Sequence, residues 1–394
     1  MSRSLVAGID IGTYHVKVVI ANSQERNEKG FPQIIGIGTA ESRGLRHGYI
    51  VNIQDVVESI KAALNEAETR AGVRVKKAFV SVGGIGLGSI TSTSSTIISR
   101  ADSEITALDI KKVQEQCEKD IPATAALNKK IIHSIPIQYK IDGRVVLGKP
   151  EGMKGNKLEV KTLYITCLEH HLNDIIQAVE EAGVSVQDVM ASPIAASLVT
   201  LTKSQKIAGC VLTNIGAETV SIAVFENNMP VSLEIFPIGS TDITNDIALG
   251  LKVPLEEAEQ IKIGAITGNS YPRKKLEEII SARLSDIFEL IEAHLKKIGR
   301  NGLLPAGIVI TGGGSGLTSI EELAKASLKL PSRIGIVHLG LSDKQSYKDS
   351  TWAVAYGLCI LGIHADEDMP IDNSSRILGS AWKKVVMWFK QFLP

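Results

Sequence analysis

The chain has few of the features that mark secreted, metal-binding or membrane-spanning proteins. Its cysteines are scarce and lie far apart, at Cys117, Cys167, Cys210 and Cys359. Because no two of them form a C-x-x-C pair, we expect buried thiols in a reducing compartment and no disulfide framework. The eight histidines show no metal-ligand spacing, and we expect His170 and His171 to be solvated at the start of a helix.

Long apolar runs and an excess of one charge are also missing. No run approaches the roughly 18 apolar residues that span a bilayer, and no apolar segment of a secretion signal precedes the first predicted strand. Lys and Arg total 43, as do Asp and Glu, so the overall basic charge typical of nucleic-acid binding is absent. These absences predict a cytoplasmic protein without a nucleic-acid partner, which can still lie on a membrane surface.

The length and composition indicate a soluble protein with more than one domain. Hydrophobic residues make up 44% of the chain and charged residues 22%, as in ordinary globular proteins. A chain of 394 residues exceeds the size at which a single core keeps growing.

One phrase occurs twice, about half a chain length apart. The segment 10–19 aligns without gaps on 214–223, and each copy follows an apolar run. Both copies predict a strand, a tight turn at Gly12 or Gly216, and a second strand. A glycine at such a turn lets backbone N–H groups approach an anion closely, so two such hairpins could hold a polyphosphate from both sides. Ordinary β-hairpins are the alternative, but the gapless repetition favours the functional interpretation.

The predicted elements follow the same duplication. Strands near 4–11, 15–22 and 33–41 precede a helix over 55–71, and strands 208–215, 219–226 and 230–237 precede helices over 240–250, 255–264 and 276–298. Between Lys77 and Cys167 the pattern changes to β-rich segments around one helix, 107–119, which predicts a small α+β insertion. Gly312, Gly313 and Gly314 follow a short apolar strand and are either a third phosphate or nucleoside element or a plain βα loop.

Together these motifs resemble the superfamily of actin, sugar kinases and heat-shock chaperone ATPases, and within it the FtsA family of bacterial division proteins. The segments 44–52 and 237–262 also resemble that family. The resemblance implies an α/β actin-like ATPase fold with two duplicated α/β domains, a small α+β insertion in the first half and a C-terminal amphipathic helix. Its implied subdomains are a first core (1–83 and 163–198), the insertion (84–162), a second core (199–239 and 302–364), a helical subdomain (240–301), a linker (365–375) and the helix (376–394).

The resemblance also implies a site for ATP and Mg²⁺. Asp10 would hold the metal through water. Glu259 and Lys262 would reach the nucleoside, although a Glu and a Lys three apart on a helix are also a common surface pair. The nucleotide-binding residues implied by the match are Gly12, Thr13, Tyr14, His15, Lys17, Asn214, Gly216, Ala217, Glu218, Thr219, Gly239, Glu259, Lys262, Gly312, Gly313 and Gly314.

Two departures from the superfamily pattern concern hydrolysis. Members that hydrolyse ATP well have an acidic residue in each hairpin, but the counterpart of Asp10 here is Asn214. A Glu or Gln often orients the attacking water where this chain has Ser192, and a hydroxyl is a poor base at neutral pH. No catalytic residue is assigned. We expect nucleotide binding with weak or absent hydrolysis.

The C-terminal segment has the composition of a helix that lies in a lipid interface. From Arg376 to Pro394 there are four cations and no acid. Wound as a helix, the apolar residues share a face opposite Lys383 and Lys384. A helix that docks on the body or on a partner is the alternative, but the acidic linker before it favours the membrane. The residues that we expect to contact the membrane are Trp382, Lys383, Lys384, Val385, Trp388, Phe389, Lys390 and Phe392.

For function, the resemblance implies a protein that polymerises on the inner face of the membrane at the division site, anchors FtsZ filaments and recruits later division proteins. Arg273 and Arg283 would contact the carboxylates of the FtsZ C-terminal peptide, or they are solvated surface arginines. A type IV pilus assembly protein of the same fold and, with less support, a small-molecule kinase are the other interpretations; neither explains the C-terminal segment.

Truncation after Ser375 should leave a folded, nucleotide-binding protein that no longer sediments with anionic liposomes, because interfacial binding needs the apolar face and about 1 kcal/mol per nearby cation. Trp388→Glu should reduce sedimentation with the liposomes nearly as much as the truncation does. Lys383→Ala with Lys384→Ala should weaken binding mainly on anionic lipid and in a salt-dependent way. If the truncated chain sediments as well as the full chain, the segment is a docking helix for a protein.

Overall fold

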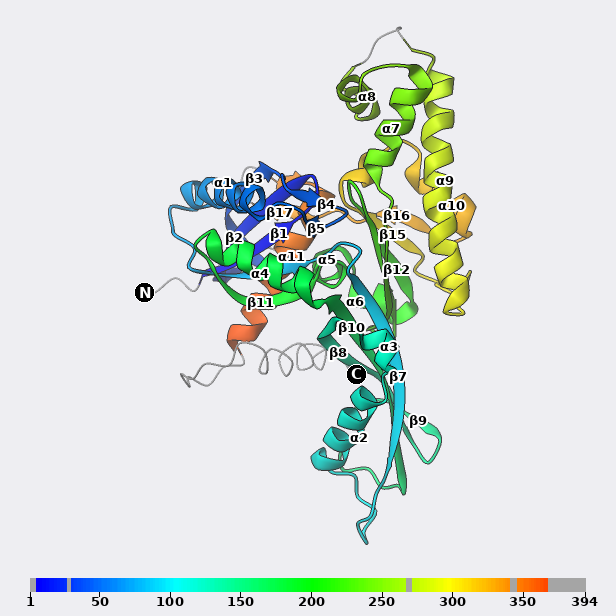
Figure 1. Cartoon of the computed structure of the whole chain (residues 1–394). Helices are drawn as coiled ribbons and strands as arrows, with labels where there is room; N and C mark the ends of the chain where they lie inside the picture. The colour runs from blue at the N-terminus through cyan, green and yellow to red at the C-terminus, as the bar shows by residue number, and fades with distance from the viewer. Residues whose placement is uncertain (1–4, 27–29, 267–270, 341–345, 368–394) are drawn as a thin grey trace.

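The computed structural model describes residues 5–26, 30–266, 271–340 and 346–367, which form two similar halves (Figure 1). Each half contains a five-stranded sheet, in the order β11-β6-β1-β2-β3 or β14-β13-β12-β15-β16. In both, three consecutive strands form an antiparallel meander and two later strands extend the sheet in parallel from the first of them. The predicted duplication is therefore confirmed.

Of the ten strands in the two sheets, the six that form the meanders lie close to the expected segments, whereas β16 was not predicted. The strands of the first sheet are β1 (Leu5–Ile11), β2 (His15–Arg26), β3 (Pro32–Glu41), β6 (Lys77–Val82) and β11 (Ser185–Ala191). Those of the second are β12 (Cys210–Ile215), β13 (Val220–Glu226), β14 (Met229–Phe236), β15 (Ile308–Thr311) and β16 (Ser332–Ile334). β1 and β12 lie centrally and are mostly buried on both faces, which explains why each reads as a continuous apolar run.

Helices cover these sheets, and short elements connect them. α1 (Ile53–Ala71) begins at Asn52, whose side chain accepts hydrogen bonds from the backbone N–H groups of Gln54 and Asp55. It packs on β2 and β3 through its buried apolar face. The other elements of the two cores are β4 (Leu45–Arg46), β5 (Tyr49–Ile50), α4 (Glu169–Glu181), α5 (Ser192–Thr200), α6 (Lys203–Ala208), η1 (Gly313–Gly316), α10 (Ile320–Leu328), β17 (His338–Gly340), β18 (Ser346–Lys348), η2 (Ser350–Trp352) and α11 (Ala353–Glu367).

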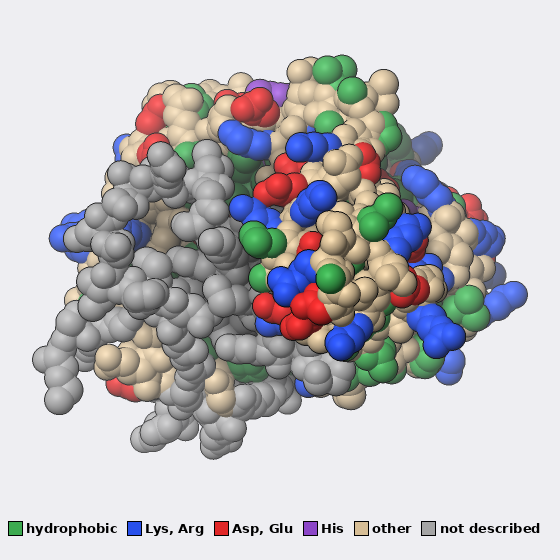
Figure 2. Space-filling view, turned by 90° about the horizontal axis from the view of Figure 1, so that it is seen from below, with side chains coloured by type: hydrophobic (Ala, Val, Ile, Leu, Met, Phe, Trp, Pro, Cys, Tyr) green, Lys and Arg blue, Asp and Glu red, His purple; other side chains and the backbone are tan. Residues whose placement is uncertain are grey.

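The insertion forms a separate four-stranded sheet, in the order β7-β10-β8-β9, with its own small core beneath α2 (Figure 1). Its elements are β7 (Leu87–Ile97), α2 (Ala107–Lys119), α3 (Ala123–Ala126), β8 (Lys129–Ile141), β9 (Arg144–Val146) and β10 (Lys157–Leu168). β10 pairs with β8 as far as Leu168, so the insertion extends beyond the predicted end at residue 162. In the view from below, positive and negative side chains are interspersed on the described surface (Figure 2).

The predicted helical subdomain contains α7 (Ser240–Leu251), α8 (Leu255–Lys262) and α9 (Arg273–Lys297). It lies at the end of the molecule opposite the insertion (Figure 1). α9 buries Leu284, Ile287 and Phe288 on one face, as its apolar spacing predicts. Farther along, the His294 ring is hydrogen-bonded through Nε2 to the hydroxyl of Ser232 at 2.8 Å. The long helix is therefore attached to the second sheet by both apolar and polar contacts.

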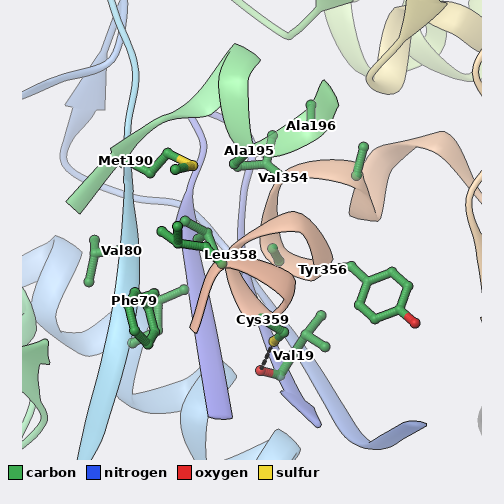
Figure 3. Packing of buried hydrophobic residues seen from close by; sticks show 14 of the residues in the cluster. Val19, Phe79, Val80, Met190, Ala195, Ala196, Val354, Tyr356, Leu358 and Cys359 are labelled. Carbon is green, nitrogen blue, oxygen red and sulfur yellow. Dashed lines mark hydrogen bonds between the residues drawn. The ribbon is translucent and has the colours of Figure 1, made fainter. Parts of the chain in front are cut away.

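The helices α5 and α11 cross each other (Figure 3). A Cβ on Gly357 of α11 would overlap the carbonyl oxygen of Ala195 in α5. α11 also lies against β1 and β2 of the first sheet, and the Cys359 thiol donates to the carbonyl oxygen of Val19 at 3.3 Å. The helix that ends the second half thus packs on the first.

α11 continues to Glu367, so the first three residues of the predicted linker 365–375 are helical. The remainder of that linker and the predicted membrane helix 376–394 lie outside the described residues. Among the residues that the structure describes, no helix is long and apolar enough to cross a membrane.

Gly357→Ala should lower the free energy of unfolding by about 1–3 kcal/mol or more, because the added methyl group forces apart two helices in contact. Gly88→Ala is the matched control, since a Cβ there meets no heavy atom within 4 Å. Thermal unfolding followed by circular dichroism should show a clear fall in Tm for the first variant only. Equal Tm values would mean that the crossing is looser than described.

Candidate functional site

A cavity of about 600 Å³ lies between the two halves and is lined by most of the predicted site residues. Both repeated turns, the triple-glycine loop and α8 contribute to its walls. The predicted residues that line it are Asp10, Gly12, Thr13, Tyr14, His15, Lys17, Ser192, Asn214, Gly216, Ala217, Thr219, Glu259, Lys262, Gly312, Gly313 and Gly314. Glu218 and Gly239, which were also predicted, do not line it.

The two repeated turns have the same geometry. The N–H of Gly12 donates to the carbonyl oxygen of His15 at 3.2 Å, and that of Gly216 donates to the carbonyl oxygen of Thr219 at 2.9 Å. A Cβ on either glycine would lie 2.9 Å from the same acceptor, closer than side chains normally come. The turn therefore requires glycine in both halves, which explains why the repeat is recognisable in the sequence.

The turns differ in charge. Across the first hairpin Asp10 is paired with Lys17, whereas at the same register of the second hairpin Asn214 is paired with Ser221. The hydroxyl of Ser81 on β6 donates to Oδ1 of Asp10 at 2.8 Å. Only the first hairpin thus carries a carboxylate and an ammonium at this register.

Desolvation perturbs both charged groups of the first hairpin. Burial raises the pKa of Asp10, while Lys17 and the hydrogen bond from Ser81 lower it. Burial lowers the pKa of Lys17, while Asp10 and Asp349 raise it. The Lys17 ammonium donates to the carbonyl oxygen of Thr351 at 3.0 Å, in η2 just before α11. A cation beside Asp10 or an anion beside Lys17 would favour the charged form of either group.

The glycine loop packs directly on the second turn. Gly312 has a φ of +88°, in the region that favours glycine, and a Cβ there would overlap Oδ1 of Asn214. A Cβ on Gly314 would overlap the side chain of Ile215, whereas one on Gly313 meets no heavy atom within 4 Å. Two of the three glycines therefore serve packing, and Gly313 leaves open space beside the cavity.

On the helical side, Glu259 and Lys262 are bound to each other and to α7. The Lys262 ammonium lies 2.7 Å from Oε2 of Glu259 and donates to Oγ1 of Thr244 at 2.8 Å and to the carbonyl oxygen of Ser240 at 3.1 Å. The Thr244 hydroxyl donates to the same Glu259 oxygen at 2.6 Å. This network holds the carboxylate and the ammonium at the wall of the cavity rather than leaving them as a loose surface pair.

Other predicted residues have different surroundings. The guanidinium of Arg283 donates to both carboxylate oxygens of Asp246, at 2.7 and 3.0 Å, so these N–H donors are already bonded within the helical subdomain. Arg273, by contrast, is exposed at the first residue of α9. The expectation for His171 was wrong. It is buried, and its Nε2 donates to the carbonyl oxygen of Gly83 at 2.8 Å.

Sequence reasoning missed part of the cavity wall. Thr39, Gly48, Ser81, Gly83 and Gly84 of the first half line it. The family-like segment 44–52 was a signal for Gly48, but nothing in the sequence related it to the turns. The described residues contain no group of three or more His, Cys, Asp or Glu side chains arranged for a metal. The cavity therefore offers backbone N–H groups and the Lys17 ammonium for an anion, with the Asp10 carboxylate close by, while Lys262 also lines the wall but is paired with Glu259.

Two family models match the chain. The model described as cell division protein FtsA matches residues 211–357, and the model described as the SHS2 domain inserted in FtsA matches residues 87–166. The second match ends close to the end of β10 and supports the longer insertion.

Curated relatives cover nearly the whole chain. Cell division protein FtsA of Pseudomonas aeruginosa is 32% identical over 401 aligned residues, with 95% of this chain and 94% of the relative covered. That of Bacillus subtilis is 30% identical, with 87% of this chain and 81% of the relative covered.

Solved structures with a similar fold include a PilM-PilN type IV pilus biogenesis complex and MreB5 of Spiroplasma citri bound to ADP. For the first, the TM-score is 0.64 at 17% identity, over 91% of this chain and 98% of the other. For the second, the TM-score is 0.52 at 12% identity, over 93% of this chain and 99% of the other. These likenesses confirm the predicted actin-like fold.

Proposed function

The chain belongs to the FtsA family of cell division proteins, and from this membership we propose that it binds ATP with Mg²⁺ between its halves, polymerises on the inner face of the cell membrane, anchors FtsZ filaments there and recruits later division proteins. The observation that carries the nucleotide part is the meeting of two glycine turns of the same geometry at one cavity with the glycine loop and the Glu259–Lys262 network.

The residues of the cavity fit a magnesium–nucleotide complex. Backbone N–H groups of the two turns and the Lys17 ammonium suit the phosphates, the open space at Gly313 suits a nucleoside pressed against backbone, and Glu259 and Lys262 suit its polar groups. Asp10 would hold Mg²⁺ through water, and the ion would supply positive charge that offsets the charge of the phosphates. The raised pKa of Asp10 fits a carboxylate that a cation would stabilise.

The same cavity supports slow or absent hydrolysis. Asn214 provides no negative charge at the second turn, and Ser192, which is 8% exposed, provides only a hydroxyl. Because phosphoryl transfer depends on positioning of water and metal, neither residue replaces a carboxylate or a Gln. ATP would then act as a bound effector rather than as a substrate that turns over quickly.

Membrane attachment and FtsZ binding have separate supports. The first is proposed from the composition of residues 376–394. The second is proposed for α9, where exposed Arg273 is the better candidate because a carboxylate of the FtsZ peptide would have to displace Asp246 from Arg283. The pilus and kinase interpretations have no such support, since the two curated relatives described above are FtsA proteins.

The function is tested by co-sedimentation of the full chain with anionic liposomes, with and without FtsZ and ATP. FtsZ should sediment only when this protein is present, and Arg273→Ala should weaken that recruitment several-fold while liposome binding by the variant itself is kept. Lys274→Ala is the matched control, a neighbouring exposed cation of α9. FtsZ left in the supernatant in the presence of the unmodified chain would overturn the anchoring role.

Gly313→Asp should weaken ATP binding at least tenfold, or by about 1.4 kcal/mol, because it puts a carboxylate beside a polyanion. Gly313→Ala should weaken it less, and neither variant should change Tm without nucleotide, since the site for the new side chain is open. Isothermal titration calorimetry measures the affinities. Unchanged affinity of the Asp variant would mean that the nucleoside does not lie against this loop.

A single-turnover assay should find bound ATP largely uncleaved over minutes, because Asn214 and Ser192 supply no carboxylate for the attacking water. Rapid release of phosphate that Asp10→Ala abolishes would contradict this expectation.

A further inference from the structure

Glu218 belongs to the second turn but reaches across to the first half. Its carboxylate accepts a hydrogen bond from the backbone N–H of His47, and Nδ1 of His47 donates to the carbonyl oxygen of Glu218 at 3.2 Å. His47 lies at the tip of the β4–β5 hairpin, in the left-handed region with a φ of 49°. Two residues 171 positions apart are thus joined by both side chains and both backbones.

The hairpin that carries His47 is in turn attached to the start of the insertion. The carbonyl oxygen of His47 accepts from the N–H of Ile85 at 3.2 Å. A Cβ on Gly48 would overlap the backbone of Gly84, so the two backbones touch without side chains between them. Such a contact between two backbones leaves little room for one to move without the other.

The last strand of the insertion returns to the same place. The N–H of Leu168, at the end of β10, donates to the carbonyl oxygen of Gly86 at 3.0 Å, immediately before β7 begins. The ring of Tyr49 in β5 packs edge-on against His171, just after β10, with ring centroids 4.9 Å apart. The start of the insertion and the helix α4 that follows its last strand therefore both contact the β4–β5 hairpin.

The second turn is also fixed to the helical subdomain. The N–H groups of Ser240 and Thr241, at the start of α7, donate to the carbonyl oxygens of Gly216 and Ala217 at 2.9 and 2.8 Å. Glu218 is therefore the residue of this turn whose carboxylate links it to the opposite half. A displacement of the turn would be passed to His47 through two hydrogen bonds, one of them to a charged group and hence stronger than a neutral one.

We propose that Glu218 and His47 form a cross-cleft clasp that couples occupancy of the phosphate site to the position of the inserted subdomain. Glu218 is a positioning residue, since it does not line the cavity. It holds the second turn against the first half, and Ile85 carries the position of that turn into β7. The clasp itself stands on geometry, whereas its response to ATP rests on the proposed function.

Hydrogen–deuterium exchange of the full chain tests the clasp without and with ATP–Mg²⁺, in peptides that cover 12–20, 45–52 and 85–98. Without nucleotide, Glu218→Ala should speed exchange in 45–52 about tenfold, because the N–H of His47 loses its acceptor. In the unmodified chain, ATP should slow exchange in both 12–20 and 85–98. In Glu218→Ala the protection of 12–20 should remain at saturating ATP, while that of 85–98 should be lost.

Two further variants separate the clasp from general destabilisation. Glu218→Gln keeps an acceptor oxygen of the same shape and should keep most of the protection of 85–98. His47→Asn keeps the backbone N–H in a residue that tolerates the left-handed region, and it should show an intermediate loss because only the ring contact is removed. If Glu218→Ala does not fold, Glu218→Gln takes its place in the test. Residues 45–52 of this variant should still exchange faster than in the unmodified chain.

The outcomes distinguish the clasp itself from its coupling to ATP binding. Equal exchange of 45–52 in the unmodified chain and Glu218→Ala overturns the clasp, whatever ATP does. ATP protection of 85–98 that persists in Glu218→Ala overturns the coupling. Failure of the unmodified chain to bind ATP in calorimetry overturns the proposed nucleotide function and with it the coupling, while the comparison without nucleotide still decides the clasp.

Discussion

The crossing of α5 and α11 is the contact on which the arrangement of the two halves depends. The two helices approach so closely that Gly357 has no room for a Cβ beside Ala195. α11 follows the second half in sequence and lies on the first sheet, and α5 follows the first half and contacts β12 and β13 of the second. Because each half supplies the helix that packs on the other, the cores join here, and the two turns are held on opposite walls of one cavity.

Much of this architecture is predictable from the sequence because its signals are local. The turns at Gly12 and Gly216 recur since the same backbone clash excludes other residues in both places. The strands and helices follow apolar spacing within each segment. The cavity residues contributed by the turns, the glycine loop and α8 follow from the same motifs, and the duplication indicates that they face one another.

The remainder depends on contacts between distant segments, which leave no pattern in a single sequence. His171 was predicted to be solvated, but it is buried because Gly83 and Tyr49, remote in sequence, surround it. Arg283 resembles a free surface cation until Asp246 of α7 is found beside it. Glu218 was assigned to the nucleotide by its place in the motif, yet it points to His47. In each case the partner lies more than 30 residues away.

The two halves have the same sheet topology, but their glycine hairpins carry different charges. This difference separates the residues that can bind a charged ligand from those that can pass on a movement. The first hairpin keeps Asp10 and Lys17 across its strands, where a metal ion and phosphates can offset the cost of burying them. The second has neutral Asn214 and Ser221 at that register, so its turn offers backbone N–H groups and no carboxylate for water activation. Its acidic residue, Glu218, instead contacts the hairpin at the root of the insertion. One turn is thus suited to recognise the charge of a ligand. The other is suited to move with the ligand, so that the proposed nucleotide would be held rather than consumed.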